Sequence, residues 1–209
     1  MSEHLRYPMG KRIMLFLIIL AISSLIGVAI SAIFMSAGDT GMKIAQGLSS
    51  IMMFVVPPIV YYSITRREDQ LEAMGLRDPA EPQWIILIGV VLMFVSLPVT
   101  NQLTRWNENT TIFSAFEKLE DYLKMLEETA AATTEKMLNV NTFGGLLLNL
   151  LVIALIPAIG EELTFRGVLQ QGLMRKMNPH VAIVISAAMF SFIHFQFFGF
   201  LPRMFLGLL

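Results

Sequence analysis

Long apolar stretches recur along the chain, and shorter polar segments separate them. A helix needs about 20 predominantly apolar residues to cross the hydrocarbon core of a bilayer. We therefore predict an all-α, polytopic transmembrane helix bundle with about five complete spans and the start of a sixth. The complete spans are predicted at residues 13–35, 44–64, 84–103, 143–160 and 181–200, and residues 201–209 begin the sixth.

The two ends of the chain carry separate expectations. The first apolar run is longer than the core of about 7 to 15 residues of a signal peptide, so we predict an uncleaved helix. The last residues stop inside an apolar run, so we expect the chain to be shorter than the fold it belongs to. We predict one integral membrane domain over 1–209, with N-terminal helices and an acidic outer loop in 1–142 and an incomplete set of helices in 143–209.

Basic residues predict the orientation of the chain, because cytoplasmic segments carry an excess of Lys and Arg. With a cytoplasmic N-terminus, nine of the fifteen basic residues fall in inner segments, whereas the long outer loop at 101–142 is acidic. We therefore predict this orientation, most simply in a prokaryotic inner membrane. The inner basic residues are Arg6, Lys11, Arg12, Arg66, Arg67, Arg77, Arg166, Arg175 and Lys176.

Two further patterns predict local structure. Pro57 and Pro58 remove amide donors inside the second span, so we expect a kink or local unwinding there. In the outer loop, apolar residues recur at spacings of three and four, which predicts an amphipathic helix suited to the membrane surface or to the protein itself. This stripe consists of Phe113, Phe116, Leu119, Tyr122, Leu123 and Leu126.

Composition supports a membrane protein and excludes several functions. Hydrophobic residues make up 55% of the chain and charged residues 15%, and the mean hydropathy is +0.65, whereas soluble domains have about 25% charged residues. There is no cysteine, which excludes disulfides, thiolate nucleophiles and cysteine-based zinc sites. The net charge of −1 and the lack of a basic run or phosphate-binding loop argue against a nucleic-acid partner.

One charged cluster lies where apolar residues are expected. Residues 161–167 read Glu-Glu-Leu-Thr-Phe-Arg-Gly and follow the uncharged stretch 143–160. A charge at bilayer depth costs roughly 2.5 to 3.5 kcal/mol, so the cluster is a functional-site hypothesis. Glu162 and Arg166 are four residues apart and can form an ion pair on one helix face. Glu161 points about 100° away, and a carboxylate without its own cation in low dielectric suits a general base.

His194 is the second candidate, inside the next predicted span. The turn at 174–179 lies about 13 residues beyond Glu161 and about 16 before His194, so both side chains fall at a similar depth and could share a water. Alternatives remain open. A lone intramembrane histidine can be a packing residue, and Glu162 with Arg166 can be a buried ion pair that fixes helix packing, although this leaves Glu161 unexplained.

The two motifs resemble a known family. Glu161-Glu162-x-x-x-Arg166 followed by Phe190-x-x-x-His194 is similar to the first two signature motifs of the CAAX-protease and bacteriocin-processing family of intramembrane endopeptidases, which includes type II CAAX prenyl endopeptidase. The resemblance covers mainly residues 143–209. It implies that Glu161 activates the hydrolytic water, that Glu162 and Arg166 support it, and that His194 helps to hold the water or a metal.

The resemblance also implies a third motif, a histidine followed four positions later by Asn or a similar residue, on a later helix. His4 and His180 lie in the wrong places to replace it, so we expect weak or absent activity from residues 1–209 alone. A catalytic zinc usually has three protein ligands. Glu161 and His194 are the candidate ligands if a divalent metal such as zinc takes part, but metal-free hydrolysis is favoured because a third ligand is hard to find.

We therefore expect an intramembrane endopeptidase that hydrolyses a peptide bond of a membrane-associated or prenylated protein or peptide. Its partners are the lipid bilayer and that substrate, and the sequence predicts no oligomeric state. Two alternatives stay open. One is a catalytically inactive binding or immunity protein of the same fold. The other is a proton-coupled transporter that uses Glu161 and His194 as a relay, which the lack of an internal repeat disfavours.

Overall fold

The computed structural model describes residues 9–65, 83–109 and 116–209, and the regular structure in these ranges is helical. Four helices are long and apolar enough to cross a membrane, and two shorter apolar helices accompany them. The protein is therefore an all-helical integral membrane protein. The four long helices are Gly10–Phe34, Gly38–Thr65, Leu87–Glu108 and Phe143–Met174, and the shorter ones are Pro179–Phe192 and Phe197–Leu208.

The chain divides into two compact units, each of which is described by itself. The first contains the described residues of Met1–Arg77 together with Thr133–Asn178. The second contains the described residues of Asp78–Ala132 together with Pro179–Leu209. Each unit thus combines an early and a late part of the chain. The predicted single membrane domain stays a prediction.

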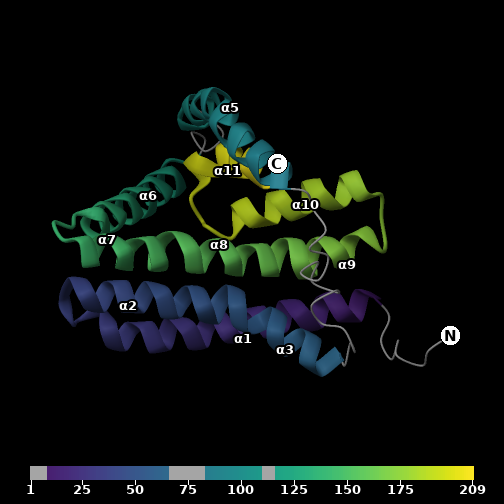
Figure 1. Ribbon diagram of the computed structural model, residues 1–209, viewed down its shortest axis with the longest axis horizontal. Coiled ribbons are helices and arrows are strands. Elements are labelled where there is room, and N and C mark those ends of the chain that lie inside the picture. The colour runs from purple at the N-terminus through teal and green to yellow at the C-terminus, as the bar shows by residue number, and fades with distance from the viewer. Residues whose placement is uncertain (1–8, 66–82, 110–115) are drawn as a thin grey trace. The chain divides into compact units, whose positions relative to one another are not determined.

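The first unit is built from three long helices. The second of them packs against both of the others and crosses the first (Figure 1). Its apolar core contains Phe16, Tyr61, Tyr62 and Val168, which come from all three helices. The first helix is α1 (Met9–Met35), and the second is the continuous run α2 (Gly38–Ser50), η1 (Ile51–Val55) and α3 (Val56–Thr65). The third runs through α7 (Phe143–Asn149), η2 (Leu150–Leu155), α8 (Ile156–Glu161), η3 (Glu162–Gln170) and α9 (Gln171–Met174).

The distortion predicted at the two prolines is confirmed as a widened turn. In η1 the hydrogen bonds span five residues instead of four, so that the Val56 amide donates to the Ile51 carbonyl. Pro57 and Pro58 follow directly and are both fully buried. The helix therefore continues through the prolines with a local change of hydrogen bonding, as proline-containing membrane helices can when neighbouring groups satisfy the freed carbonyls.

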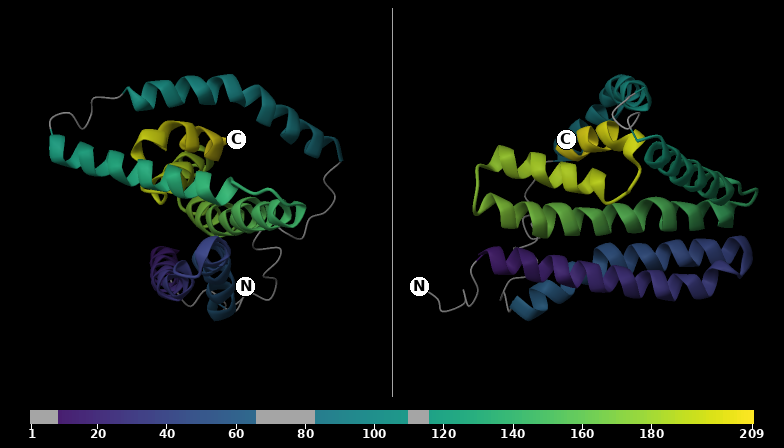
Figure 2. Two further views of the ribbon diagram at one scale, coloured as in Figure 1. Left: turned by 90° about the vertical axis from the view of Figure 1, so that its left-hand side faces the viewer. Right: turned by 180° about the vertical axis from the view of Figure 1, so that it is seen from behind.

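The second unit contains α5 (Gln83–Glu108) and α6 (Glu117–Leu138) as far as Ala132. Later in the chain it contains α10 (Pro179–Phe192), η4 (Phe197–Gly199) and α11 (Phe200–Leu208). α11 packs against both α10 and α5 (Figure 2). The α10–α11 contact is close, because a Cβ atom added to Gly207 would lie 3.1 Å from the Cβ atom of Ala187. Glycine at this position therefore permits the approach of the two helices.

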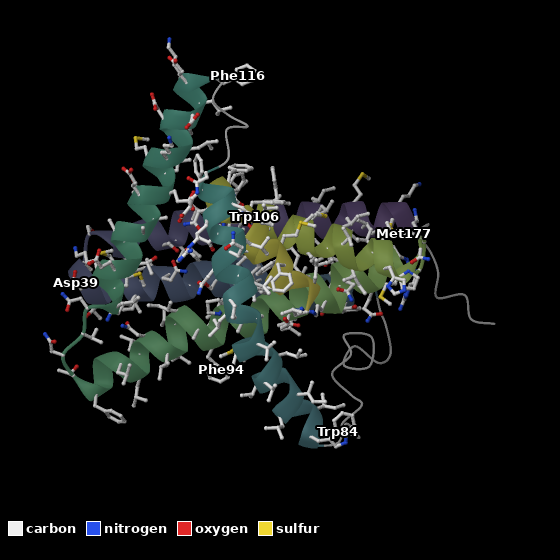
Figure 3. The ribbon with its side chains drawn as sticks, turned by 90° about the horizontal axis from the view of Figure 1, so that it is seen from above. Asp39, Trp84, Phe94, Trp106, Phe116 and Met177 are labelled. Atoms are coloured by element: carbon white, nitrogen blue, oxygen red, sulfur yellow. The ribbon has the colours of Figure 1, made fainter. Side chains whose placement is uncertain are left out.

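Helix α5 has the side chains expected of a membrane-crossing helix. Trp84 and Trp106 lie towards its two ends and are 58% and 63% exposed, and Phe94 lies between them (Figure 3). The two tryptophans are about 33 Å apart along the helix axis, close to the thickness of about 30 Å of the hydrocarbon core. Tryptophan is enriched at both interfaces of a membrane. This spacing is therefore typical of a helix that spans a bilayer.

The predicted fifth span at 181–200 is corrected. Its helix, α10, ends at Phe192 after 14 residues, a length of about 21 Å that is shorter than the hydrocarbon core. The chain then turns, and α11 begins at Phe200. Phe195 has a φ of 52°, in the left-handed region that ends a right-handed helix. Apolar composition alone could not locate this break, because the residues on both sides of it are equally hydrophobic.

The amphipathic helix predicted in the outer loop is confirmed as α6. Leu123 is buried, whereas Phe116, Leu119 and Tyr122 are exposed, so the predicted stripe does not lie on a single covered face. Some residues used in the predictions fall outside the described ranges. These are Arg6, Arg66, Arg67 and Arg77 of the inner basic set, His4, and Phe113 of the stripe.

Candidate active site

The charged motif lies within a continuous helix. The predicted span ends at residue 160, but the helix that begins at Phe143 continues to Met174, so Glu161 and Glu162 are in its interior. Glu161 ends α8 and Glu162 begins η3, where the hydrogen bonds become five residues long. Such widened turns are rare and are frequently found at functional sites.

The predicted ion pair is confirmed. Arg166 donates through Nη1 to Oε1 of Glu162. The Glu162 side chain is 57% exposed and that of Arg166 is 40% exposed, so this is not the buried packing bridge considered as an alternative. Glu161 beside the pair is half-buried.

The opposite face of the motif is buried and is fastened to the second helix of the same unit. The Thr164 hydroxyl donates to the Phe54 carbonyl at 2.7 Å. Pro58 has no amide hydrogen to offer this carbonyl, as the residue four positions later would in an α-helix. The Tyr62 hydroxyl donates to the Gly167 carbonyl at 2.8 Å. These two bonds hold the helix on the C-terminal side of the glutamates.

Close backbone packing holds the N-terminal side. A Cβ atom on Gly160 would lie 2.7 Å from the Cβ atom of Phe54 and 3.1 Å from Val55, so only glycine allows this approach. The Phe54 ring also meets the Phe165 ring, with centroids 6.1 Å apart. Sequence reasoning missed these bracing residues. The one available signal was Pro58, because it implies a carbonyl four residues earlier that needs another donor.

His194 lies in the turn after α10 and not within a helix, which corrects its predicted position. Its Nδ1 atom is 2.8 Å from the Phe190 carbonyl oxygen. A carbonyl only accepts, so Nδ1 carries the hydrogen, and in the neutral ring Nε2 holds the lone pair. The Phe190 ring contacts the imidazole edge-to-face at 5.1 Å between centroids. Phe190 thus packs against His194 and also fixes its tautomer.

The structure brings three of the four predicted site residues together. Glu161, Glu162 and Arg166 share one helix of the first unit, whereas His194 belongs to the second unit. The water that Glu161 and His194 are expected to share therefore stays a prediction.

Residues 143–209 match the family described as type II CAAX prenyl endopeptidase Rce1-like. This segment is an Rce1-like domain. It covers about a third of the chain and contains both motifs, so the resemblance inferred from them is confirmed over these residues. The chain matches no curated protein and no solved structure.

The Rce1-like domain depends on parts of the chain that lie outside it. Phe54 and Tyr62, which brace the charged motif, both precede the matched segment by many residues.

The side chains that could bind a metal ion are scattered within each unit. Within the described ranges of either unit, no three His, Asp or Glu side chains are grouped so that they could hold a metal ion. The donors present do not form a zinc site of the usual three protein ligands.

Proposed function

We propose that this protein is an intramembrane endopeptidase that hydrolyses a peptide bond in a membrane-associated or prenylated protein or peptide. The observation that carries the proposal is the Glu161-Glu162-x-x-x-Arg166 motif, which lies in an Rce1-like segment and is braced on its buried face by the Phe54 and Tyr62 contacts. Charged residues inside membrane helices almost always face a bundle interior or a water-filled cavity. The exposed pair of Glu162 and Arg166 is consistent with such a hydrated surface.

In the proposed reaction, Glu161 accepts a proton from a water molecule as the water oxygen attacks the carbonyl carbon of the scissile bond. His194 orients the water through the lone pair on Nε2. When the carbon–nitrogen bond breaks, Glu161 returns the proton to the leaving amine, so the carboxylate is regenerated. The guanidinium of Arg166 balances the charge of Glu162 and leaves Glu161 as the group that exchanges protons. The proposed steps use only the side chains of this chain and a water molecule.

The proposed substrate class follows from the position of the site and from the family. A glutamate within a membrane helix meets peptide segments that a lipid anchor or an apolar sequence brings into the bilayer. The family's description names prenyl endopeptidases, so a prenylated peptide is the first candidate. A prenyl chain would partition into the bilayer and raise the local concentration of the scissile bond near Glu161.

We expect Glu161→Gln to lower the cleavage rate by about 10²- to 10⁴-fold, because the amide cannot accept the proton of the attacking water. The measurement is cleavage of a farnesylated peptide and of its unmodified counterpart by the purified full-length protein in lipid vesicles, because weak or absent activity is expected from residues 1–209 alone. Glu128→Gln, an exposed change on α6, is the matched control and should retain full activity. Circular dichroism and thermal unfolding verify that both variants fold.

Undiminished cleavage by Glu161→Gln would remove this residue from the mechanism. If the wild-type protein binds the peptides with measurable affinity and cleaves none of them, the alternative of a catalytically inactive binding protein is supported instead.

A further inference from the structure

The connection between α10 and α11 follows His194 directly and has an unusual backbone. Phe195 has a φ of 52°. A bulky side chain in this left-handed region is strained and persists only where surrounding contacts hold it. His194 immediately precedes the strained residue. The contacts that hold the connection therefore also affect the position of His194.

One side chain of α5 bonds both the end of this connection and the first turn of α11. Asn107 comes directly after Trp106, which Figure 3 labels on α5, and it is only 4% exposed. Its Nδ2 atom donates to the Phe197 carbonyl at 2.7 Å, and its Oδ1 atom accepts from the Leu201 amide at 2.6 Å. Asn107 therefore supplies a donor to η4 and an acceptor to the first turn of α11, the two segments that directly follow Phe195 and Gln196.

Other side chains complete the hydrogen bonding of the connection. Glu127 of α6 accepts from the Phe198 amide through Oε2 at 3.1 Å. Ser191 of α10 donates to the Phe200 carbonyl at 2.7 Å. Arg203 of α11 donates to the side chain and to the carbonyl of Gln196. Among these side chains, Asn107 is the one that bonds two backbone groups, the Phe197 carbonyl and the Leu201 amide.

We propose that Asn107 is a positioning residue for His194, which it orients by holding the connection in the shape that keeps Phe195 left-handed. When these two bonds are lost, Phe195 relaxes to an ordinary backbone conformation and the turn at His194 moves with it. The imidazole then loses the Phe190 carbonyl that keeps the hydrogen on Nδ1. The catalytic meaning of this orientation rests on the proposed function, but the orientation itself can be measured without a substrate.

The chain has only three histidines, so ¹⁵N labelling of histidine resolves each imidazole, and His194→Gln assigns its signals. The test is ¹⁵N NMR of the full chain in lipid vesicles at a pH well above the ordinary histidine pKa of about 6.5. We expect wild-type His194 to show a hydrogen on Nδ1 only. In Asn107→Ala we expect the averaged signals of a ring that exchanges between tautomers. An unchanged Nδ1–H signal in Asn107→Ala overturns the proposal.

Two further variants separate positioning from general damage. Asn109→Ala removes an exposed side chain that bonds the Arg105 carbonyl on the same helix, and it should leave the His194 signals as in the wild type. Adding Phe195→Gly to Asn107→Ala should restore the Nδ1–H signal, because glycine adopts the left-handed conformation without strain. Failure of this rescue would refute the link through Phe195.

Asn107→Ser keeps a small polar side chain that is too short to bond both backbone groups, so it provides a milder variant if Asn107→Ala does not fold. We expect it to show partial loss of the Nδ1–H signal, and full retention would contradict the proposal. In the cleavage assay, Asn107→Ala should lower kcat with little change in KM. If Glu161→Gln shows that the protein is not a glutamate-dependent peptidase, the imidazole signals still decide whether Asn107 positions His194.

Discussion

At the residue scale, each motif combines a reactive group with the groups that orient it. Phe190 precedes His194 by four residues, which lets the same residue supply a ring contact and the carbonyl that fixes the tautomer. In the charged motif, Glu161 and Glu162 are followed by Thr164 and Phe165, whose side chains are buried on another face of the helix. The motif thus has two helix faces. One carries the charged side chains, and the other packs against the second helix of the same unit.

Thr164→Val should destabilise the protein by about 1 kcal/mol, because it leaves the buried Phe54 carbonyl without the hydroxyl donor. Valine has nearly the same shape, so little packing is lost. Thermal unfolding in detergent measures the change. Thr164→Ser keeps the hydroxyl and should recover most of the loss, whereas equal stability of the Val and wild-type proteins would show that the bond contributes nothing.

At the element scale, helix ends differ from those that hydrophobicity predicts. The helix that starts at Phe143 runs through the charged motif, with Glu162 and Arg166 paired on one face and Thr164 bonded to Phe54 on the other. Conversely, α10 ends at Phe192 inside an apolar stretch. The positions of the charged residues could be read from the sequence, but the helix boundaries could not, because the deciding contacts come from other helices.

Gly160→Ala should destabilise the protein by about 1 to 3 kcal/mol, because the new methyl group would overlap Phe54 at the helix crossing. Gly144→Ala is the matched control in the same helix. A Cβ atom there meets nothing within 4 Å, so the change should be neutral or stabilise the helix by up to about 1 kcal/mol. The two melting temperatures should therefore move apart, and a common shift would contradict the close packing at Gly160.

At the scale of the whole molecule, the Rce1-like domain is shared between the two compact units. Its residues up to Asn178 belong to the first unit and those from Pro179 belong to the second. Each unit also contains N-terminal helices outside the matched segment. The proposed chemistry therefore depends on the whole chain, since Glu161 is braced by the second helix and the connection after His194 is held by α5 and α6.

The proposed mechanism requires Glu161 and His194 to meet at one water molecule in the working protein. The chain has no cysteine, so a Glu161→Cys/His194→Cys variant contains only the two introduced thiols. We expect a short bifunctional thiol reagent to join them in lipid vesicles, with the linked peptides identified by mass spectrometry. In the control pair, Glu161→Cys/His180→Cys, the second thiol lies about 20 Å from the position of His194, measured along the axis of α10. This pair should remain unlinked. Equal linking of both pairs, or of neither, would count against a shared water.

The sequence by itself determined the class of protein and the four candidate site residues. These follow from residue type and local spacing, because the cost of a charge in lipid and the reach of a side chain along one helix need no knowledge of the rest of the fold. Only the tertiary structure decided which groups hold the motifs. Thr164 meets a carbonyl 110 residues away, and Asn107 meets one 90 residues away. Such partners depend on how distant helices pack, and no local pattern encodes that packing.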